Sequence, residues 1–567
     1  MQGKAFKRNL KSGSSKNLLL GTVSGLAAGA LMLMGAPHKA DAWILYNGEN
    51  YGNNLEINLT TELQYSVFYR VNDPSAVLTS PVNNANGSEG DIDFRHGIVS
   101  NQVEALPVLD IRDGDYGAHL SGELYLNTPY LGTNQNNQPD TLNPVTVSKN
   151  TDFTSATRNI DGENARVLDA FIFARHTFGD GQTLSFKVGR QTLLWGQSLL
   201  LSSDAIAGGQ APIDIILAQN TPNAETQQIV LPVGQAVVTY QPFPGTGITL
   251  QGYYQFEWAH DNFQGVGAYF NTADIFDKGG QRLLVGGGAY LFRNKDITPP
   301  SQNGQFGFSI QAPVHNIDLG LYALRFDSKT PNFYLYPGLN TGLTANGFQA
   351  GEYRVVYARD IGIFGASASG NVGPTNLAGE ISGRINQPLV SGSGGGTFLP
   401  AGPTTNAGSN PLWAVGDTIA ANASVIYISP GIPLDPGGVS FTGEIEMNHV
   451  VSVTKNRAVL TPGRQATAGV FQFILTPTYD DVLPSLDVTF PIGIQYNYLG
   501  RSEMDSTINH GTGQFNIGVA ATYRTVWTAG FTYVDFLGKP ALPATSDAAG
   551  NANADRGYVS FTISRTF

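Results

Sequence analysis

Apolar and polar residues alternate along several segments of this 567-residue chain, and this period of two most constrains its fold. In "NLEINLTTELQYSVFYR" (54–70), aliphatic and tyrosine side chains occupy nearly every second position, and polar side chains occupy the positions between them. Segments 247–258, 305–312 and 514–524 repeat the pattern. Because successive side chains of a strand point to opposite sides, each segment is predicted to form a β-strand with one apolar and one polar face.

Three further features favour a membrane barrel over a soluble β-sandwich. The strands approach the roughly 9–11 residues that cross a bilayer at a tilt. Aromatic residues such as Tyr69, Trp258 and Tyr523 stand near strand ends, where a barrel has its interfacial girdles. The polar faces also carry charges in mid-strand, which a wet lumen accepts and a dry sandwich core excludes: Glu62, Glu123, Lys187, Arg354 and Glu444.

The connections between strands are alternately long and short. Long polar links at 72–90, 128–165 and 192–233 are each followed by a tight turn, at 112–115, 178–182 and 242–247. Outer-membrane barrels have long external loops and short periplasmic turns. A long link at 386–418 breaks this alternation, through either a missed strand or a periplasmic excursion. The expected fold is an all-β, transmembrane antiparallel β-barrel of about 18 strands, with about 16 as the alternative, because even numbers are usual.

Both ends of the chain are consistent with export to the outer membrane. A basic start, an apolar stretch and the motif "ADA" (40–42) predict a cleavable signal peptide over 1–42, with a membrane anchor as the competing interpretation. Residues 43–567 would then form a single barrel domain. The final segment "GYVSFTISRTF" (557–567) is expected to close the ring against the first strand and, through Phe567, to be recognised by the barrel-assembly machinery. Arg565 departs from this terminal signal, which usually has an apolar residue third from the end.

Composition and motifs exclude several functions. The chain has no cysteine, so disulfides, a thiol nucleophile and cysteine metal sites are impossible. Cleavage after Ala42 would remove six Lys or Arg residues and Asp41, which leaves 26 basic and 43 acidic residues and no basic patch for nucleic acid. No metalloprotease, phosphate-loop or serine-hydrolase motif occurs in 43–567, and no cofactor is expected. His119 and Ser121 share a face, as in lipid-cleaving barrels, but they are predicted to point into the lumen.

The segment after residue 190 is predicted to be an insert rather than an ordinary loop. Strand alternation fades after Arg190, and "APIDIILAQNTPNAE" (211–225) is too apolar for a freely solvated loop. It folds into the barrel and narrows the pore, or it caps the extracellular mouth. Inward folding is favoured, because an exposed apolar patch is a liability. Arg190, Trp195 and Asp214 would then lie near the constriction.

Several of these segments together resemble a known family. The motifs are "VGRQTLLWGQS" (188–198), "APID" (211–214), "LPV" (231–233), "AYFNTAD" (268–274), "EYRVVYARDIGIFGASAS" (352–369), "AGEISGRINQPL" (378–389) and "LPSLDVTFPIGIQY" (483–496). In this order they are similar to bacterial outer-membrane proteins catalogued as domain of unknown function 1302. The resemblance implies a porin-like barrel, in places linked to the movement of hydrophobic compounds. Gln197 stands where the family usually has Glu, and the family's cysteine before "AYF" is absent.

The expected function is a porin-like outer-membrane channel for the passive passage of small, amphipathic or hydrophobic molecules. Its expected partners are membrane lipid and a small solute, whose identity, like the oligomeric state and gating, stays open. The alternatives are a plugged structural or surface-interaction barrel and a phospholipase-like enzyme. Selectivity is expected from the insert and from inward charges, with these candidate pore-lining residues: Arg190, Trp195, Asp214, Arg354, Glu380, Arg384 and Glu444.

Overall fold

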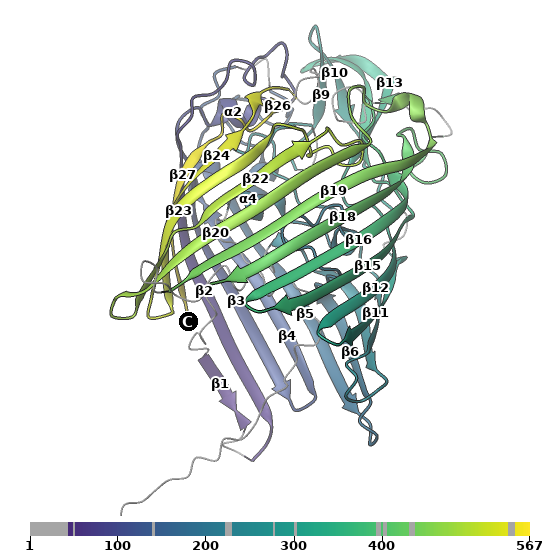
Figure 1. Ribbon diagram of the computed structural model, residues 1–567. Coiled ribbons are helices and arrows are strands. Elements are labelled where there is room, and N and C mark those ends of the chain that lie inside the picture. Colours follow the sequence, from purple (N-terminus) through teal and green to yellow (C-terminus); the bar gives the residue numbers. More distant parts are fainter. Residues whose placement is uncertain are drawn as a thin grey trace, which may run out of the picture.

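The computed structural model of the chain describes residues 43–48, 52–138, 142–220, 229–275, 278–299, 303–392, 399–400, 405–429, 437–542 and 550–567. The signal peptide and cleavage site expected over 1–42 lie outside these described residues and stay predictions. Over the described part, the chain forms a closed antiparallel β-barrel (Figure 1). The expected fold class is confirmed.

Eighteen strands form the barrel wall, which confirms the larger of the two expected numbers. The segments β21 and β22 count as one strand, because both lie between β20 and β23. The wall strands are β2 (Leu55–Arg70), β3 (Gly97–Asp113), β4 (Tyr116–Asn127), β5 (Glu163–Thr177), β6 (Thr183–Gln191), β7 (Val233–Gln241), β8 (Thr249–Gln255), β11 (Gln305–Val314), β12 (Ile317–Phe326), β15 (Ile361–Val372), β16 (Thr375–Pro388), β18 (Val415–Ile428), β19 (Val439–Lys455), β20 (Thr467–Leu483), β21 (Leu486–Thr489), β22 (Ile492–Leu499), β23 (Gly513–Tyr523), β24 (Trp527–Leu537) and β27 (Tyr558–Thr566).

The last wall strand closes the ring by pairing with the first. Strand β27 pairs with β2 from Glu62↔Thr566 to Arg70↔Tyr558. The backbone N–H of Phe567 then donates to the carbonyl of Thr61 at 2.9 Å. A short strand, β1 (Trp43–Asn47), covers the same edge of β2 further along, from Trp43↔Leu59 to Asn47↔Glu56. Nearly the whole edge of the first wall strand is therefore paired.

The two faces of the wall follow the alternation in the sequence. Leu63, Tyr65 and Tyr69 of β2 point outward and are exposed, whereas Ser66 between them points inward and is buried. Tyr523 is exposed at a strand end, as expected for an aromatic girdle. Trp258 is not part of such a girdle, because β8 ends at Gln255 and the indole is buried against Tyr357, with ring centroids 4.8 Å apart.

Long and short connections alternate around the whole ring, so the two ends of the barrel differ. One end, the turn end, has links of two to ten residues: 114–115, 178–182, 242–248, 315–316, 373–374, 429–438, 484–485 and 524–526. The opposite end, the loop end, has all the long links: 71–96, 128–162, 192–232, 256–304, 327–360, 389–414, 456–466, 500–512 and 538–557. The break expected at 386–418 does not occur, because link 389–414 joins β16 to β18 at the loop end.

That expected break arose from strands that do not belong to the wall. A separate five-stranded sheet, at the upper right of Figure 1, lies at the loop end and uses segments that also alternate. It consists of β9 (Arg282–Gly286), β10 (Ala289–Arg293), β13 (Asn332–Thr344), β14 (Gly347–Val356) and β17 (Leu399–Pro400). Arg354 lies in β14 and therefore not in the barrel wall, contrary to expectation.

Short helical turns and one further strand pair lie in the loops. They are α2 (Glu89–Asp93), η2 (Thr128–Leu131), α3 (Ser155–Thr157), η4 (Arg158–Gly162), η5 (Ala207–Gly209), α4 (Ile215–Asn220), η6 (Arg457–Val459), β25 (Lys539–Pro540) and β26 (Gly550–Asn551). None of the helices in the described part of the chain has the length and apolar character needed to cross a membrane.

Candidate pore constriction

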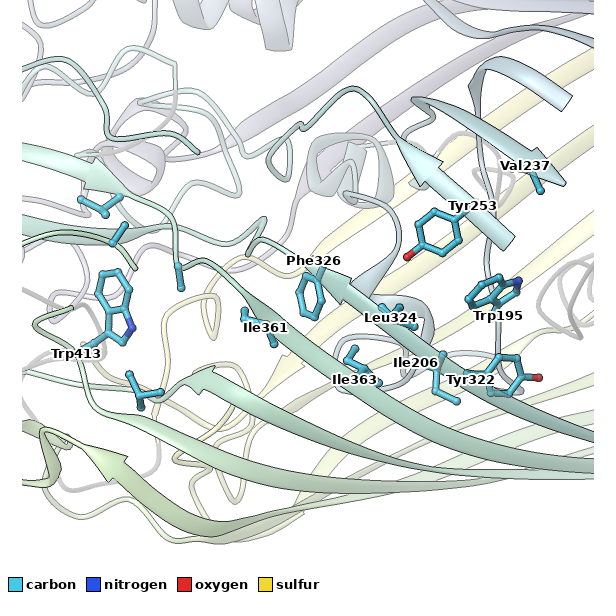
Figure 2. Close-up of a cluster of buried hydrophobic side chains, with 14 of the residues drawn as sticks. Trp195, Ile206, Val237, Tyr253, Tyr322, Leu324, Phe326, Ile361, Ile363 and Trp413 are labelled. Carbon is cyan, nitrogen blue, oxygen red and sulfur yellow. The ribbon is translucent and has the colours of Figure 1, made fainter. Parts of the chain in front are cut away.

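The link between β6 and β7, residues 192–232 and called the insert here, enters the barrel. Trp195 is 1% exposed and packs its indole against two inward tyrosines, with centroids 5.0 Å from Tyr253 and 5.9 Å from Tyr322 (Figure 2). The indole N–H donates to Oε1 of Gln251 on β8 at 2.6 Å. Inward folding, the favoured of the two expected arrangements, is therefore confirmed for the described part of the insert.

The apolar residues of the insert are buried against the inner wall. Ile206 packs beside Leu324 of β12 and Ile363 of β15, and Figure 2 shows the cluster extending to Trp413. Ile216 and Leu217, from the apolar motif in the sequence, are also buried. The cluster contains Trp195, Ile206, Val237, Tyr253, Tyr322, Leu324, Phe326, Tyr334, Val356, Ala358, Ile361, Ile363, Ala407, Trp413 and Val415. The insert and the loop end thus fill part of the lumen.

Two carboxylates of the inner wall hold the backbone of the insert. Glu380 on β16 accepts the N–H of Ser198 at 3.2 Å and of Ile206 at 2.9 Å, and it also accepts the N–H of Gln197. Glu444 on β19 accepts three consecutive N–H groups, those of residues 199–201, with Leu201 at 3.0 Å. These N–H groups would otherwise lose their water partners on entering the lumen. Both glutamates point inward as predicted, but they anchor the insert rather than line open water.

Arg384 complements these anchors with positive charge. Its Nη2 donates to the carbonyls of Ser203 at 2.8 Å and of Ala205 at 2.9 Å. Between them, the Asp204 carboxylate accepts an amide N–H of Asn448 on β19 at 2.7 Å. Burial and, secondarily, the charge of Asp505 raise the pKa of Asp204 to about 6. Residues 197–206 are therefore fixed to β16 and β19 by hydrogen bonds in both directions.

Asp214 and Arg190, expected together at the constriction, lie on different faces. Asp214 is buried inside, where it forms an ion pair with Arg166 of β5. Arg190 lies on the outward face, because the inward positions of β6 are odd-numbered and Phe186 and Val188, of its own parity, are exposed. It pairs there with Glu257 at 3.1 Å. Arg354, outside the wall, lies over the Tyr336 ring at 5.0 Å.

Nearer the turn end, the inner face is polar and accessible to solvent. Lys187 points inward and is exposed, 5.4 Å from the centroid of the Phe171 ring. His119 and Ser121 also point inward, as predicted, but they contact different carboxylates. His119 Nδ1 lies 2.7 Å from Asp110, and the Ser121 hydroxyl donates to Asp169 at 3.1 Å. Each has its own acidic partner, and no hydrogen bond between the two is observed.

The sequence did not predict a buried charge cluster at the loop end, called the cap cluster here: Arg70, Asp91, Asp555 and Arg556. Arg556 donates to both oxygens of Asp91 at 3.2 Å and to the carbonyl of Asn271 at 2.7 Å. Arg70 pairs with Asp91 at 3.1 Å and with Asp555 at 3.5 Å. The cluster joins loops 71–96, 256–304 and 538–557. Loop residues have no periodicity, so no sequence pattern reveals such partners.

A second set of acids lies beside the cap cluster. Burial raises the pKa of Asp274 to about 7. The pKa values of Glu89 and Asp93 are raised well above the ordinary range by burial and then by the charge of Asp274. No group of three or more His, Cys, Asp or Glu side chains suited to a metal ion occurs among the described residues.

Solved structures that align with the chain include OccAB4 of Acinetobacter baumannii, at 8% identity over 90% of this chain and 98% of that one, with a TM-score of 0.41. A BenF-like porin from Pseudomonas fluorescens Pf-5 aligns at 9% identity over 90% and 99%, with a TM-score of 0.40. OccK9 (OpdG) of Pseudomonas aeruginosa aligns at 12% identity over 90% and 98%, with a TM-score of 0.38.

No curated protein matches the sequence. A family model described as "Protein of unknown function (DUF1302)" matches residues 23–567, which include every wall strand and the whole insert. The chain therefore belongs to the DUF1302 family.

Proposed function

We propose that this protein is a porin-like channel of the bacterial outer membrane, through which small, amphipathic or hydrophobic molecules pass passively. The observation that carries the proposal is the insert, which is fixed inside a closed barrel by Glu380, Arg384 and Glu444. A barrel of this size holds more space than side chains fill, and an insert then sets how much of it stays open.

The two faces of the wall support a membrane location. Exposed Leu, Ile, Val and Phe side chains cover the outside, and a soluble protein rarely exposes so much contiguous apolar surface. The loop end would face outward and the turn end the periplasm, as short turns do in such barrels. Export through a signal peptide over 1–42, and recognition of the strand ending at Phe567 by the barrel-assembly machinery, belong to the same proposal.

A plugged structural barrel is the second candidate function. It is favoured by the cap cluster and by the apolar cluster around Phe94, Tyr130, Phe153 and Tyr269, which together tie the outer loops to one another. In a plugged barrel the outer loops would carry the function, by contacting other molecules at the cell surface. The phospholipase-like alternative requires lipid hydrolysis that disappears in Ser121→Ala.

Planar-bilayer recording separates the channel from the plug. The purified protein should conduct ions, and a variant in which a short Gly-Ser linker replaces 203–225 should conduct more, since the narrowing segment is gone. If both proteins stay closed, the barrel is plugged by its outer loops and the channel proposal is wrong. Uptake of candidate solutes by a deletion strain and its parent then identifies the solute class.

A further inference from the structure

The barrel wall has a free strand edge near the loop end. Strand β5 pairs with β4 over its upper half, from Leu126↔Glu163 to Gly122↔Val167. Its other neighbour, β6, ends at Gln191 and pairs with β5 only as far as Ala170↔Arg190. Residues 163–169 therefore have no strand partner on the β6 side in the described part of the chain. The chain that would have continued β6 has turned inward to form the insert.

A cavity of about 840 Å³ lies at this free edge. Both Arg166 and Val167 line it, although Arg166 points inward to Glu123 and Val167 points outward with 53% of its surface exposed. Neighbouring residues of a strand face opposite sides of the sheet. A cavity that touches both residues lies along the free edge of β5, where the inner and outer faces of the wall meet. The outward Arg190, at the end of β6, also lines it.

The cavity opens at the height of the apolar outer belt. On β4, Leu124 and Leu126 stand opposite Ala165 and Glu163, and these leucines point outward with 48% and 43% of their surfaces exposed. An unpaired strand edge facing hydrocarbon would leave backbone N–H and C=O groups without partners, so such edges occur at membrane depth only where they are buried in protein or line a water-filled space. The cavity at the free edge of β5 supplies such a space, and this opening reaches the outward, exposed Val167.

Arg166 forms the inner boundary of this opening. Besides the large cavity, it lines a smaller one of about 10 Å³ on the lumen side, together with Gln102, Asp214 and Leu217. Ion pairs to Glu123 of the wall and Asp214 of the insert hold its guanidinium in place. Because Asp214 belongs to the insert, the insert and the inner wall meet at this boundary.

The lining of the large cavity has the chemistry of a site for an anionic amphiphile. Ile160, Leu168 and Leu231 supply apolar surface, and no Asp or Glu lines the cavity. Arg166 and Arg190 already have acidic partners, whereas the exposed Lys278 has no ion pair with any described residue. The volume of the cavity lies within the roughly 300–1,000 Å³ that is usual for small-molecule sites. A single apolar chain with one negative head group matches both kinds of surface.

We propose that this opening, between β5 and the start of β7, is a lateral portal through which single-chain carboxylates pass between the lumen and the hydrocarbon of the membrane. Lys278 holds the carboxylate, and Val167, Leu168 and Leu231 contact the chain on its way to the lipid. The inference rests on the proposed channel function and adds a route through the wall.

The first test blocks the portal and leaves the lumen unchanged. Val167→Trp places an indole in the opening, and Ile172→Trp is the matched control, since Ile172 is an outward residue on the fully paired part of the same strand. Uptake of radiolabelled hexadecanoate by a deletion strain carrying each variant is compared with ion conductance of each purified protein. The portal predicts uptake at least about fivefold lower in Val167→Trp, because overpacking excludes the chain, with unchanged conductance and with normal uptake in the control.

Conductance separates a failed portal from a failed channel. Wild-type uptake in Val167→Trp with normal conductance overturns the portal and leaves the channel function standing. A wild-type protein that neither conducts nor restores uptake to the deletion strain overturns the proposed function, and the portal with it.

A binding measurement tests the head-group contact without transport. Purified protein is labelled with hexadecanoate bearing a diazirine at the end of its chain, and cross-linked peptides should contain residues 160–168 or 231. Lys278→Gln should reduce labelling about tenfold, since it removes the charge that pairs with the carboxylate. The control Lys149→Gln replaces an exposed lysine outside the cavity and should leave labelling unchanged. Labelling elsewhere on the barrel, or equal labelling of Lys278→Gln and wild type, would overturn the assigned site.

Discussion

The carboxylate of Glu444, in the barrel wall, accepts the backbone N–H of Leu201, in the insert, at 3.0 Å across 243 residues of sequence. Glu380 binds the N–H groups of Ser198 and Ile206 in the same way, from a neighbouring part of the wall. Hydrogen bonds to a charged group contribute about 1.5–3 kcal/mol each. The inward carboxylates that were expected to contribute to selectivity thus hold the segment that narrows the lumen.

Replacing both anchors with their amides should loosen the insert. Each of Glu380→Gln and Glu444→Gln keeps an oxygen acceptor but loses its charge, so each should weaken docking by roughly 1 kcal/mol. The two losses sum to roughly 2 kcal/mol, so the double variant should open on the order of thirtyfold more often in single-channel recordings. Asp318→Asn is the control, since Asp318 is an exposed inward carboxylate of β12 with no contact to the insert. Identical opening of the double variant and wild type would contradict the anchoring role.

Docking of the insert should weaken as pH rises from about 4 to about 6. The pKa of Asp204 is raised from 3.8 to about 6 in the docked insert, so the undocked carboxyl ionises first and stability of the docked state is lost through this window. Channel opening should increase over the same interval and level off above it. Asp204→Asn should remove this dependence. If opening instead falls as pH rises, or Asp204→Asn titrates like wild type, the assignment fails.

The cap cluster should hold the outer loops together. Arg556→Met leaves Asp91 buried with only Arg70 as a partner, and removing one member of a buried ion pair typically costs about 3–5 kcal/mol. Limited proteolysis should then cut loop 71–96 faster, while the wall stays folded as judged by its heat-modifiable band on a gel. The control variant Arg457→Met replaces an exposed arginine in loop 456–466. Loop 71–96 of this variant should be cleaved at the wild-type rate. Unchanged cleavage of Arg556→Met would show that the cluster is dispensable.

Asp274 should make the outer loops more stable in acid than in base. Its pKa is raised from 3.8 to about 7, so its contribution to stability is full below about pH 4 and is lost as pH rises through about 7. Asp274→Asn should therefore raise the unfolding temperature at pH 8 and leave it unchanged at pH 4. Thermal unfolding of both proteins at the two pH values checks this. An equal shift at both values would assign the effect to packing rather than to charge.

The sequence predicted the features of the wall that depend on local periodicity. Leu63 and Tyr65 point outward and Glu444 inward, because side-chain direction in a strand follows from residue parity alone. Apolar content was enough to predict that the insert folds inward, since Ile216 and Leu217 need a surface to cover them.

Features that depend on partners distant in sequence were not predictable in this way. Strand β14 alternates like a wall strand, so Arg354 was assigned to the wall although its strand pairs within the five-stranded sheet. The loss of alternation after Arg190 groups this residue with the insert, whereas its parity in β6 places its side chain on the outward face. The mid-strand charge of Glu444 was visible, but the N–H groups that it binds lie more than 240 residues away. Whether any of these residues affects transport stays a prediction.

The central claim is that polar faces surround water inside the ring and apolar faces contact lipid outside it. Lys187 and Val188 test it directly, because they are adjacent on β6, face opposite sides and lie in a chain without cysteine. Lys187→Cys and Val188→Cys are recorded in planar bilayers while a charged, water-soluble methanethiosulfonate is added. The account predicts a stepwise change of current in Lys187→Cys and none in Val188→Cys; a change in Val188→Cys alone, or in neither, would contradict it.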